Sequence, residues 1–316
     1  MNAHLPSLNA ELNIKPGRGN PLVSIGFPVY NGSRFMRHAL DSLLTQTYED
    51  IEIVIADNAS IDETQEICTA YAKKDSRIRY FRNEENMGAV WNYNHVFELS
   101  SAKFFMWASC DDYWDPIYIE TCLQSITASS KMILAGTICQ GVHPDTNRIR
   151  LIDAGITTVG MRPFNRFKHY KSIIHRGKHI GGIFYGLYRS SELKKVMPIK
   201  KLIAADHFII ADLALRGEFV TVPKALFFKR WGGASRNFKK SAAAIGIKNR
   251  FLIAVPYLIR EFFMQMIIYR SANLSWKNKV RLAVWSLGNY FRVNLLKMTY
   301  IEIKIFVKRF IGTYCG

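Results

Sequence analysis

The sequence predicts an α/β protein with a mostly parallel sheet flanked by helices, and three observations indicate this class. Between residues 21 and 128, strand patterns alternate four times with helix patterns. Two of the strands end on acids, Asp57 and the pair Asp111–Asp112, and open α/β sheets bind ligands at the carboxyl ends of their strands. The 316 residues, 49% of them hydrophobic, are enough for a sizeable core.

The first half of the chain has the pattern of four strand–helix units. Apolar, often β-branched runs predict the strands, and apolar residues at helical spacing predict the helices. We expect strands at 22–29, 51–56, 78–81 and 103–108, and helices at 33–45, 62–74, 88–99 and 116–128. Ser33 and Asp115 are the expected N-caps of two helices, with Pro116 at a first helical position. Such units imply right-handed parallel connections.

The second half changes character. Strands are expected at 132–140 and 148–151, a helix at 206–215, and two more strands at 219–222 and 225–229. From about residue 242 the pattern is helical and very apolar, with interruptions at Pro256, 271–279 and Gly288. Residues 1–20 have little periodicity and are expected to form a loose leader.

The net charge of +18 is concentrated in the C-terminal part. Residues 224–316 hold 18 Lys and Arg but only two acids, and they are also apolar, which disfavours a disordered basic arm. No run reaches 18 uncharged apolar residues, so a surface-lying helical region is favoured over a membrane span. The five scattered cysteines favour a reducing compartment, and the N-terminus shows no signal-peptide pattern.

The acid pair has two interpretations. Carboxylates that end a buried strand need a partner, and a divalent cation is a usual one. Alone, however, such a dipeptide before a helix is more often an ordinary cap, and Asp57 could likewise be the turn residue of 57–60. The buried strand before Asp111–Asp112 and the second strand that ends on an acid favour the interpretation as a metal site. The chain contains no GxGxxG or GxxxxGK[ST] phosphate loop.

Five segments in order resemble the family 2 glycosyltransferases of the GT-A fold, over roughly residues 21–235. They are VSIGFPVYN at 23–31, QTY at 46–48, IVIADNASID at 53–62, the stretch from Asn86-Met-Gly88 to Asn94, and Cys110-Asp111-Asp112. The resemblance implies a GT-A-like, Rossmann-type catalytic domain at 21–240, with a nucleotide-sugar half at 21–130 and an acceptor half at 131–240. The leader 1–20 precedes it, and the helical region 241–316 follows.

The resemblance also implies an activity. It is that of an inverting, metal-dependent, hexosyltransferase-type enzyme in cell-surface polysaccharide synthesis. The donor would be a nucleotide sugar, expected to be UDP-linked, and the acceptor a hydroxyl of a glycan or lipid-linked molecule. Asp206 would be the general base, with an ordinary N-cap as the alternative interpretation. Asp111 would hold a Mg²⁺ or Mn²⁺ ion that bridges the diphosphate.

Contacts with the nucleotide sugar are implied for ten positions. They are Pro28, Tyr30, Asn31, Asp57, Asn86, Gly88, Asn94, Asp111, Asp112 and Arg189. Asp57 would accept a hydrogen bond from the base, Asp112 would contact the ribose or the sugar, and Arg189 would face the donor. Two departures from the family pattern are Ser109, where many members have an acid, and the lack of a His in the stretch 229–235.

Alternatives remain open for function and for the tail. The chain could be a non-catalytic relative that binds sugar nucleotides or glycans, or a nucleotidyltransferase, although 27–32 lacks that class's glycine-rich basic loop. Region 241–316 suits an anionic membrane surface, which implies a cytoplasmic protein that is peripheral on the inner face of the cell membrane. Packing on the catalytic domain or oligomerisation would also explain it. No nucleic-acid fold pattern accompanies the charge, so no nucleic-acid partner is expected.

Overall fold

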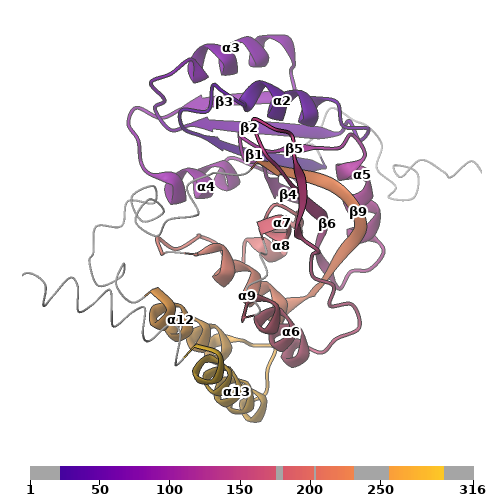
Figure 1. Ribbon diagram of the computed structural model, residues 1–316, viewed down its shortest axis with the longest axis vertical. Coiled ribbons are helices and arrows are strands. Elements are labelled where there is room, and N and C mark those ends of the chain that lie inside the picture. The colour runs from indigo at the N-terminus through magenta and orange to yellow at the C-terminus, as the bar shows by residue number, and fades with distance from the viewer. Residues whose placement is uncertain (1–21, 176–180, 203, 231–255, 295–316) are drawn as a thin grey trace, which may run out of the picture.

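The computed structural model describes residues 22–175, 181–202, 204–230 and 256–294 (Figure 1). The predicted leader and the tail segments 242–255 and 295–316 lie outside the described residues. The described strands form one sheet in the order β3-β2-β1-β4-β8-β6-β9-β5, with β7 paired to β6. Their bounds are β1 Val23–Val29, β2 Ile51–Asp57, β3 Ile78–Arg82, β4 Phe104–Trp107, β5 Tyr113–Trp114, β6 Met132–Val142, β7 Ile149–Asp153, β8 Leu187–Arg189 and β9 Glu218–Arg230.

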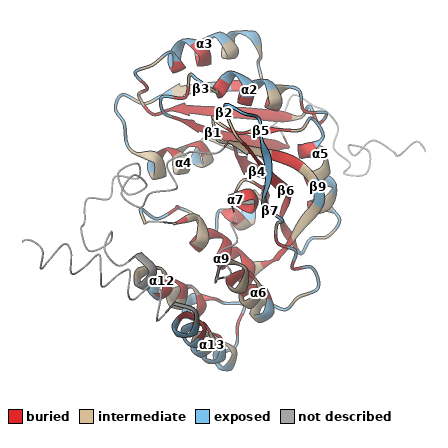
Figure 2. Cartoon of the chain, in the orientation of Figure 1, coloured by how far each residue is buried: buried red, intermediate tan, exposed pale blue. Residues whose placement is uncertain are grey.

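Helices cover both faces of this sheet (Figure 2). Their bounds are α2 Met36–Leu44, α3 Thr64–Lys74, α4 Ala89–Glu98, α5 Tyr118–Thr127, α6 Pro163–His175, α7 Gly181–Phe184, α8 Ser190–Leu193, α9 Asp206–Arg216, α12 Pro256–Arg270 and α13 Trp276–Asn294. Alternation along β4 shows the two cores: Phe104 and Met106 pack with α2 and α5, whereas Phe105 and Trp107 pack with α4 and α9.

The parallel half of the sheet agrees with the sequence. β1 pairs in parallel with β2 and β4, and β2 pairs in parallel with β3. Every residue of β1 and β2 is buried, as expected for strands covered on both faces. The carboxyl ends of β1, β2 and β4 therefore lie at one edge, which is where the sequence places its acids.

The second half of the sheet is mixed. β8 is antiparallel to both β4 and β6, β6 runs parallel to β9, and β5 is antiparallel to β9. The prediction of two strands around Pro223 is wrong, because β9 is one 13-residue strand. Its register against β6 shifts between Val222 and Ala225, so Pro223 and Lys224 fit as a bulge.

The predicted N-caps are also wrong. α2 begins at Met36 and α5 at Tyr118, and neither start has a side-chain cap bond. Asp115 instead closes the preceding turn, with its Oδ1 accepting from the N–H of Ile117 at 3.1 Å. The N–H of Ser33 donates to Asp62 at 3.0 Å, so it joins two loops. Short polar side chains serve turns as readily as helix starts.

The described part of the C-terminal region packs on α6 and α9 (Figure 1). Glu261 of α12 is buried and accepts from Lys171 of α6 at 2.5 Å and from Ser286 of α13 at 2.7 Å. Gly288 lies inside α13 and does not interrupt it, contrary to the prediction. Of the alternatives for the tail, packing on the rest of the chain therefore holds for 256–294. Within the described ranges, no helix combines the length and apolarity that a bilayer crossing requires.

Candidate functional site

A cleft of about 960 Å³ lies at the carboxyl edge of the parallel strands. Its walls come from the end of β1 and the following turn, from Asn58 after β2, from the start of α4, and from the end of β4. Six of the ten residues with a predicted donor contact line it: Pro28, Tyr30, Asn31, Asn86, Gly88 and Asp111. Their roles there stay predictions, but the structure brings them to one cavity.

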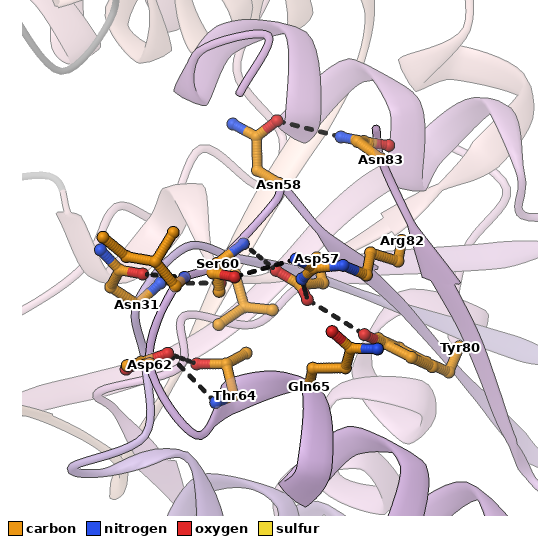
Figure 3. A network of polar contacts seen from close by, with 12 residues as sticks. Asn31, Asp57, Asn58, Ser60, Asp62, Thr64, Gln65, Tyr80, Arg82 and Asn83 are labelled. Carbon is orange, nitrogen blue, oxygen red and sulfur yellow. Dashed lines mark hydrogen bonds and ion pairs between the residues drawn. The ribbon is translucent and has the colours of Figure 1, made fainter. Parts of the chain in front are cut away.

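The turn after β1 is fixed by contacts with the loop after β2. Asn31 has a left-handed backbone with φ 51°, which asparagine tolerates better than most residues. Its N–H donates to the Ser60 hydroxyl, and its Oδ1 accepts from the N–H of Ile61, both at 2.9 Å (Figure 3). These bonds leave Tyr30 46% exposed beside the cleft.

Asp57 lies under this turn and does not line the cleft. Its fully buried carboxylate accepts from the Ser60 N–H at 2.9 Å, from Tyr80 at 3.0 Å and from Arg82 at 2.5 Å (Figure 3). The Arg82 side chain is 32% exposed, so it covers Asp57 on the side nearer solvent. A contact between Asp57 and a base stays a prediction, and it requires Arg82 to move.

Asn58 is a site residue for which the sequence suggested no role. Its Oδ1 accepts from the Met87 N–H and from Asn83, both at 3.0 Å, and its Nδ2 donates to Asn86 at 2.7 Å. These bonds hold the loop before α4, where Gly88 has the positive φ of 88° that glycine adopts readily. Asparagines at strand ends and before helices are the signal that could have found this network.

The two acids of the pair point to different places. Asp111 lines the cleft, and the hydroxyl of Ser109 donates to its Oδ1. Asp112 is 1% exposed, and its Oδ1 accepts from the N–H of Arg230 at 3.0 Å. Burial raises the pKa of Asp112 to about 7, although Lys229 and Arg230 oppose the shift. The N–H of Arg230 binds one carboxylate oxygen, whereas the buried Oδ2 has no hydrogen-bond partner among the described residues. The predicted contact of Asp112 with the ribose or sugar stays a prediction.

Two cations at the end of β9 stand beside the acid pair. Arg230 donates to the carbonyl oxygen of Asp111 at 2.5 Å and contacts His38 at 2.7 Å. The Lys229 ammonium lies 4.7 Å from the ring centre of Tyr185. Burial alone would lower the pKa of Lys229, but the acid pair raises it above its ordinary value. Basic residues thus occupy the stretch in which the family pattern would place a His.

Asp206 begins α9 and is not its N-cap, which is Ala205. Within the described part of the chain, no hydrogen bond or ion pair engages its partly exposed carboxylate. Burial raises the pKa of the Tyr185 hydroxyl, and the carboxylates of the acid pair and of Asp206 raise this pKa further. The Tyr185 hydroxyl contacts that of Tyr93 on the cleft wall at 3.0 Å. The ordinary-cap interpretation of Asp206 is thus excluded, while its role as base stays a prediction.

Asn94 and Arg189, for which donor contacts are predicted, bond to the protein backbone outside the cleft. Asn94 makes paired bonds to the backbone of Ile199, at 3.1 and 2.8 Å, and so positions the segment that brings Lys201 to the cleft. Arg189 pairs with Phe104 at the amino end of β4, opposite the acids. Its guanidinium donates to the carbonyls of Met132, Ile126 and Ser129 at 2.6 to 3.1 Å. Neither residue lines the cleft.

Arg189→Met should therefore destabilise the fold without weakening ligand binding in the cleft. Three carbonyls lose their donor, which we expect to cost about 2–3 kcal/mol of unfolding free energy. Denaturant unfolding measures the loss, with Arg148→Met on the exposed β6–β7 turn as the matched control. Unchanged stability together with weakened nucleotide binding would show that Arg189 contacts the donor.

The described residues fit a divalent cation only in part. In ranges 22–175, 181–202, 204–230 and 256–294, no three His, Cys, Asp or Glu side chains gather as a metal site. Among the described residues, Asp111 is the single acid on the cleft lining. Mg²⁺ often binds through one or two carboxylates, with waters and substrate phosphates as its other ligands. The donor set therefore fits an ion shared with a diphosphate, and it does not fit a preformed protein cage.

Part of the chain is similar in sequence to known glycosyltransferases. The sequence profile described as Glycosyl transferase family 2 matches residues 24–195. An uncharacterised glycosyltransferase of Rickettsia felis is 45% identical over 102 residues, which is 32% of this chain and 16% of that protein. Across the first curated relatives, the match spans 16% to 48% of their length.

Solved structures add the fold. Staphylococcus aureus TarS 1–349 in complex with UDP-GlcNAc superposes with a TM-score of 0.63 at 16% identity, covering 85% of this chain and 72% of that one. The mannosyltransferase PcManGT of Pyrobaculum calidifontis, in complex with GDP-Man and Mn²⁺, gives 0.53 at 14%, covering 92% and 87%. At these identities the likeness concerns the fold alone, and it confirms the predicted GT-A-like class.

Proposed function

We propose that this chain, which belongs to glycosyl transferase family 2, transfers a sugar from a nucleotide-sugar donor to a hydroxyl group. The observation that carries the proposal is the cleft at the carboxyl edge of the sheet, with Asp111 on its wall. Asp206, which begins α9 and has no hydrogen-bond or ion-pair partner among the described residues, supports it as the candidate base. A cleft of about 960 Å³ has room for a nucleotide diphosphate, since small-molecule sites span about 300–1,000 Å³.

We propose a UDP-linked donor. The end of β1 and the Asn58–Asn86 network form the wall of the cleft that would hold the nucleoside. A uracil imide N–H is a natural donor to a carboxylate, which Asp57 offers if Arg82 turns away. Arg34 and Lys201 are exposed cations on the part of the lining that the structure describes, and they could bind the diphosphate. A Mg²⁺ or Mn²⁺ ion held by Asp111 would supply further positive charge against the leaving diphosphate.

The chemistry that fits is a single displacement with inversion. Asp206 would take the proton of the acceptor hydroxyl, whose oxygen then attacks the anomeric carbon opposite the leaving diphosphate. Its carboxylate is suited to this role because no described residue engages it. The hydroxyl groups of Tyr185 and Tyr93 are in contact, and Lys229 lies over the Tyr185 ring. In this partly buried cluster, charges would interact more strongly than in water. We propose that the hydroxyl belongs to a glycan or lipid-linked acceptor in cell-surface polysaccharide synthesis.

A donor screen with purified protein tests the activity. Nucleoside diphosphate should be released from one nucleotide sugar, slowly with water alone and faster with an acceptor, when Mn²⁺ or Mg²⁺ is present. Binding without release across the screen would favour a non-catalytic sugar-nucleotide-binding protein. Release of pyrophosphate from nucleoside triphosphates would favour a nucleotidyltransferase.

With one carboxylate on the described part of the lining, we expect metal and nucleotide to bind together. Adding Mn²⁺ should tighten UDP binding about tenfold or more in calorimetric titrations, because an ion held by Asp111 would add positive charge beside the phosphates. Uridine is the matched control, since it keeps the base and ribose but supplies no phosphate oxygen. Equal UDP affinity with and without metal would remove the ion from this site.

A further inference from the structure

Helix α13 carries an apolar stripe on its exposed face. Its five residues follow one another at intervals of three or four, which places them within about 80° of the helix circumference. They are Trp276, Val280, Val284, Leu287 and Phe291, with exposed fractions from 39% to 67%. The opposite face, which includes Leu282 and Ser286, is buried against the rest of the protein. No described residue covers the stripe.

The surroundings of the stripe are basic. Lys277, Arg281 and Arg292 are exposed and lie along one side of it at helical spacing. Helix α13 has no acid, and the single acid of α12 is Glu261, which is buried and paired with Lys171. The exposed surface of both helices therefore has positive charge with no carboxylate to offset it. An apolar stripe with a basic flank is the composition of helices that lie in a membrane interface.

A second cavity adjoins the basic flank. It has about 320 Å³ and opens between the start of α6 and the turn that joins α12 to α13. Among the described residues, no acid lines it, whereas two arginines and three asparagines do: Arg162, Arg281, Asn165, Asn273 and Asn278. Arg281 also belongs to the flank of the stripe, and its guanidinium lies 5.6 Å from the ring centre of Phe164. Arginine forks with neighbouring amide donors suit a phosphate group.

We propose that the stripe and this cavity form one surface that docks on an anionic lipid bilayer. The stripe enters the boundary between headgroups and acyl chains, and the cavity takes the phosphate of one lipid headgroup. Charge complementarity favours this occupant over a second copy of the chain, whose matching surface would have the same positive charge. The inference adds a place of action to the proposed function, on which it rests only for the idea of a membrane-borne acceptor.

Vesicle flotation of the full chain tests the docking without donor or acceptor, so its result is independent of transfer activity. The chain should float with phosphatidylcholine vesicles that contain about 30% phosphatidylglycerol, and not with phosphatidylcholine alone, and salt should weaken the binding. Val284→Glu should lower partitioning at least about tenfold. Leu151→Glu is the matched control, because the two side chains are 65% and 63% exposed and Leu151 lies on β7.

Two further experiments test the role of the cavity and the insertion of the stripe into the bilayer. Arg281→Glu should weaken binding to anionic vesicles, whereas Lys131→Glu, at an exposed position before β6, should not. Brominated lipids should quench Trp276, and Trp276→Phe should remove that quenching while the protein still floats. Inorganic phosphate alone should not reproduce the change in fluorescence.

Three results would overturn the proposal. They are equal flotation with neutral and anionic vesicles, flotation unaffected by Val284→Glu, and a change of sedimentation by Val284→Glu in lipid-free protein. The last would show that a second copy, or residues 295–316 of the chain itself, covers the stripe. A phosphate effect without vesicle binding would reduce the cavity to a site for a free anion.

Discussion

Asp206→Asn is expected to abolish sugar transfer, with kcat lowered about 10²–10⁴-fold, the usual contribution of a general base. An amide cannot take the acceptor's proton, while the shape of the side chain stays the same. The fold should survive, because no described hydrogen bond or ion pair involves this carboxylate. Its place in the first turn of α9 is worth only about 0.3–1 kcal/mol through the helix dipole.

Single-turnover transfer and nucleotide titration together measure this effect. Donor affinity should remain unchanged, since Asp206 lies outside the cleft lining. Asp212→Asn is the control on the same helix: Asp212 is paired with Arg216 at 2.9 Å and takes no part in the proposed chemistry. Near-normal turnover of Asp206→Asn, or an equal loss in Asp212→Asn, would show that the base lies elsewhere.

Asp111→Asn should have the second largest effect, with a fall of about 10³-fold in kcat/KM. The variant removes the one acid that the described residues place on the cleft lining, and with it the proposed anchor of the cation. A bound ion is worth several kcal/mol against the leaving diphosphate, which corresponds to this factor. The amide oxygen can still accept from Ser109, so the end of β4 should keep its conformation.

Two measurements separate a metal role from a structural one. Mn²⁺ should no longer tighten UDP binding in Asp111→Asn, and adding more metal should not restore turnover. Asp115→Asn is the matched control, because it keeps an acceptor for the N–H of Ile117 a few residues further along the same segment. Activity of the unaltered chain that persisted after exhaustive chelation would contradict the role assigned to Asp111.

The alternation of strands and helices up to residue 128 was predictable because its signals are local. β-Branched runs and helical spacing lie within short windows, and the strand pairing follows from the order of the units. That order brought Tyr30, Asn86 and Asp111 to one cleft, since parallel strands share their carboxyl edge. The helix starts were predicted less well, because Ser33 and Asp115 bond within or between turns.

The partners of the buried charges were not predictable in this way. Adjacent acids look equivalent in a sequence, yet Asp111 lines the cleft and Asp112 is held by the N–H of Arg230, 118 residues away. Arg189 and Asn94 match donor-contact positions, but the pairing of β8 with β4 and the segment at Ile199 give both of them structural tasks. Glu261 interrupts an apolar pattern and proves to be paired with Lys171.

The sequence by itself determined the fold class, the edge of the sheet that carries the cleft and most of the cleft's wall. Only the tertiary structure decided which acid of the pair stays in the cleft, that Lys229 and Arg230 stand beside it, and that α13 turns an apolar stripe outward. The physical reason is the sequence distance over which each kind of interaction acts. Periodicity and turn chemistry act over a few residues, whereas a buried charge takes its partner from whichever distant segment the packing brings next to it.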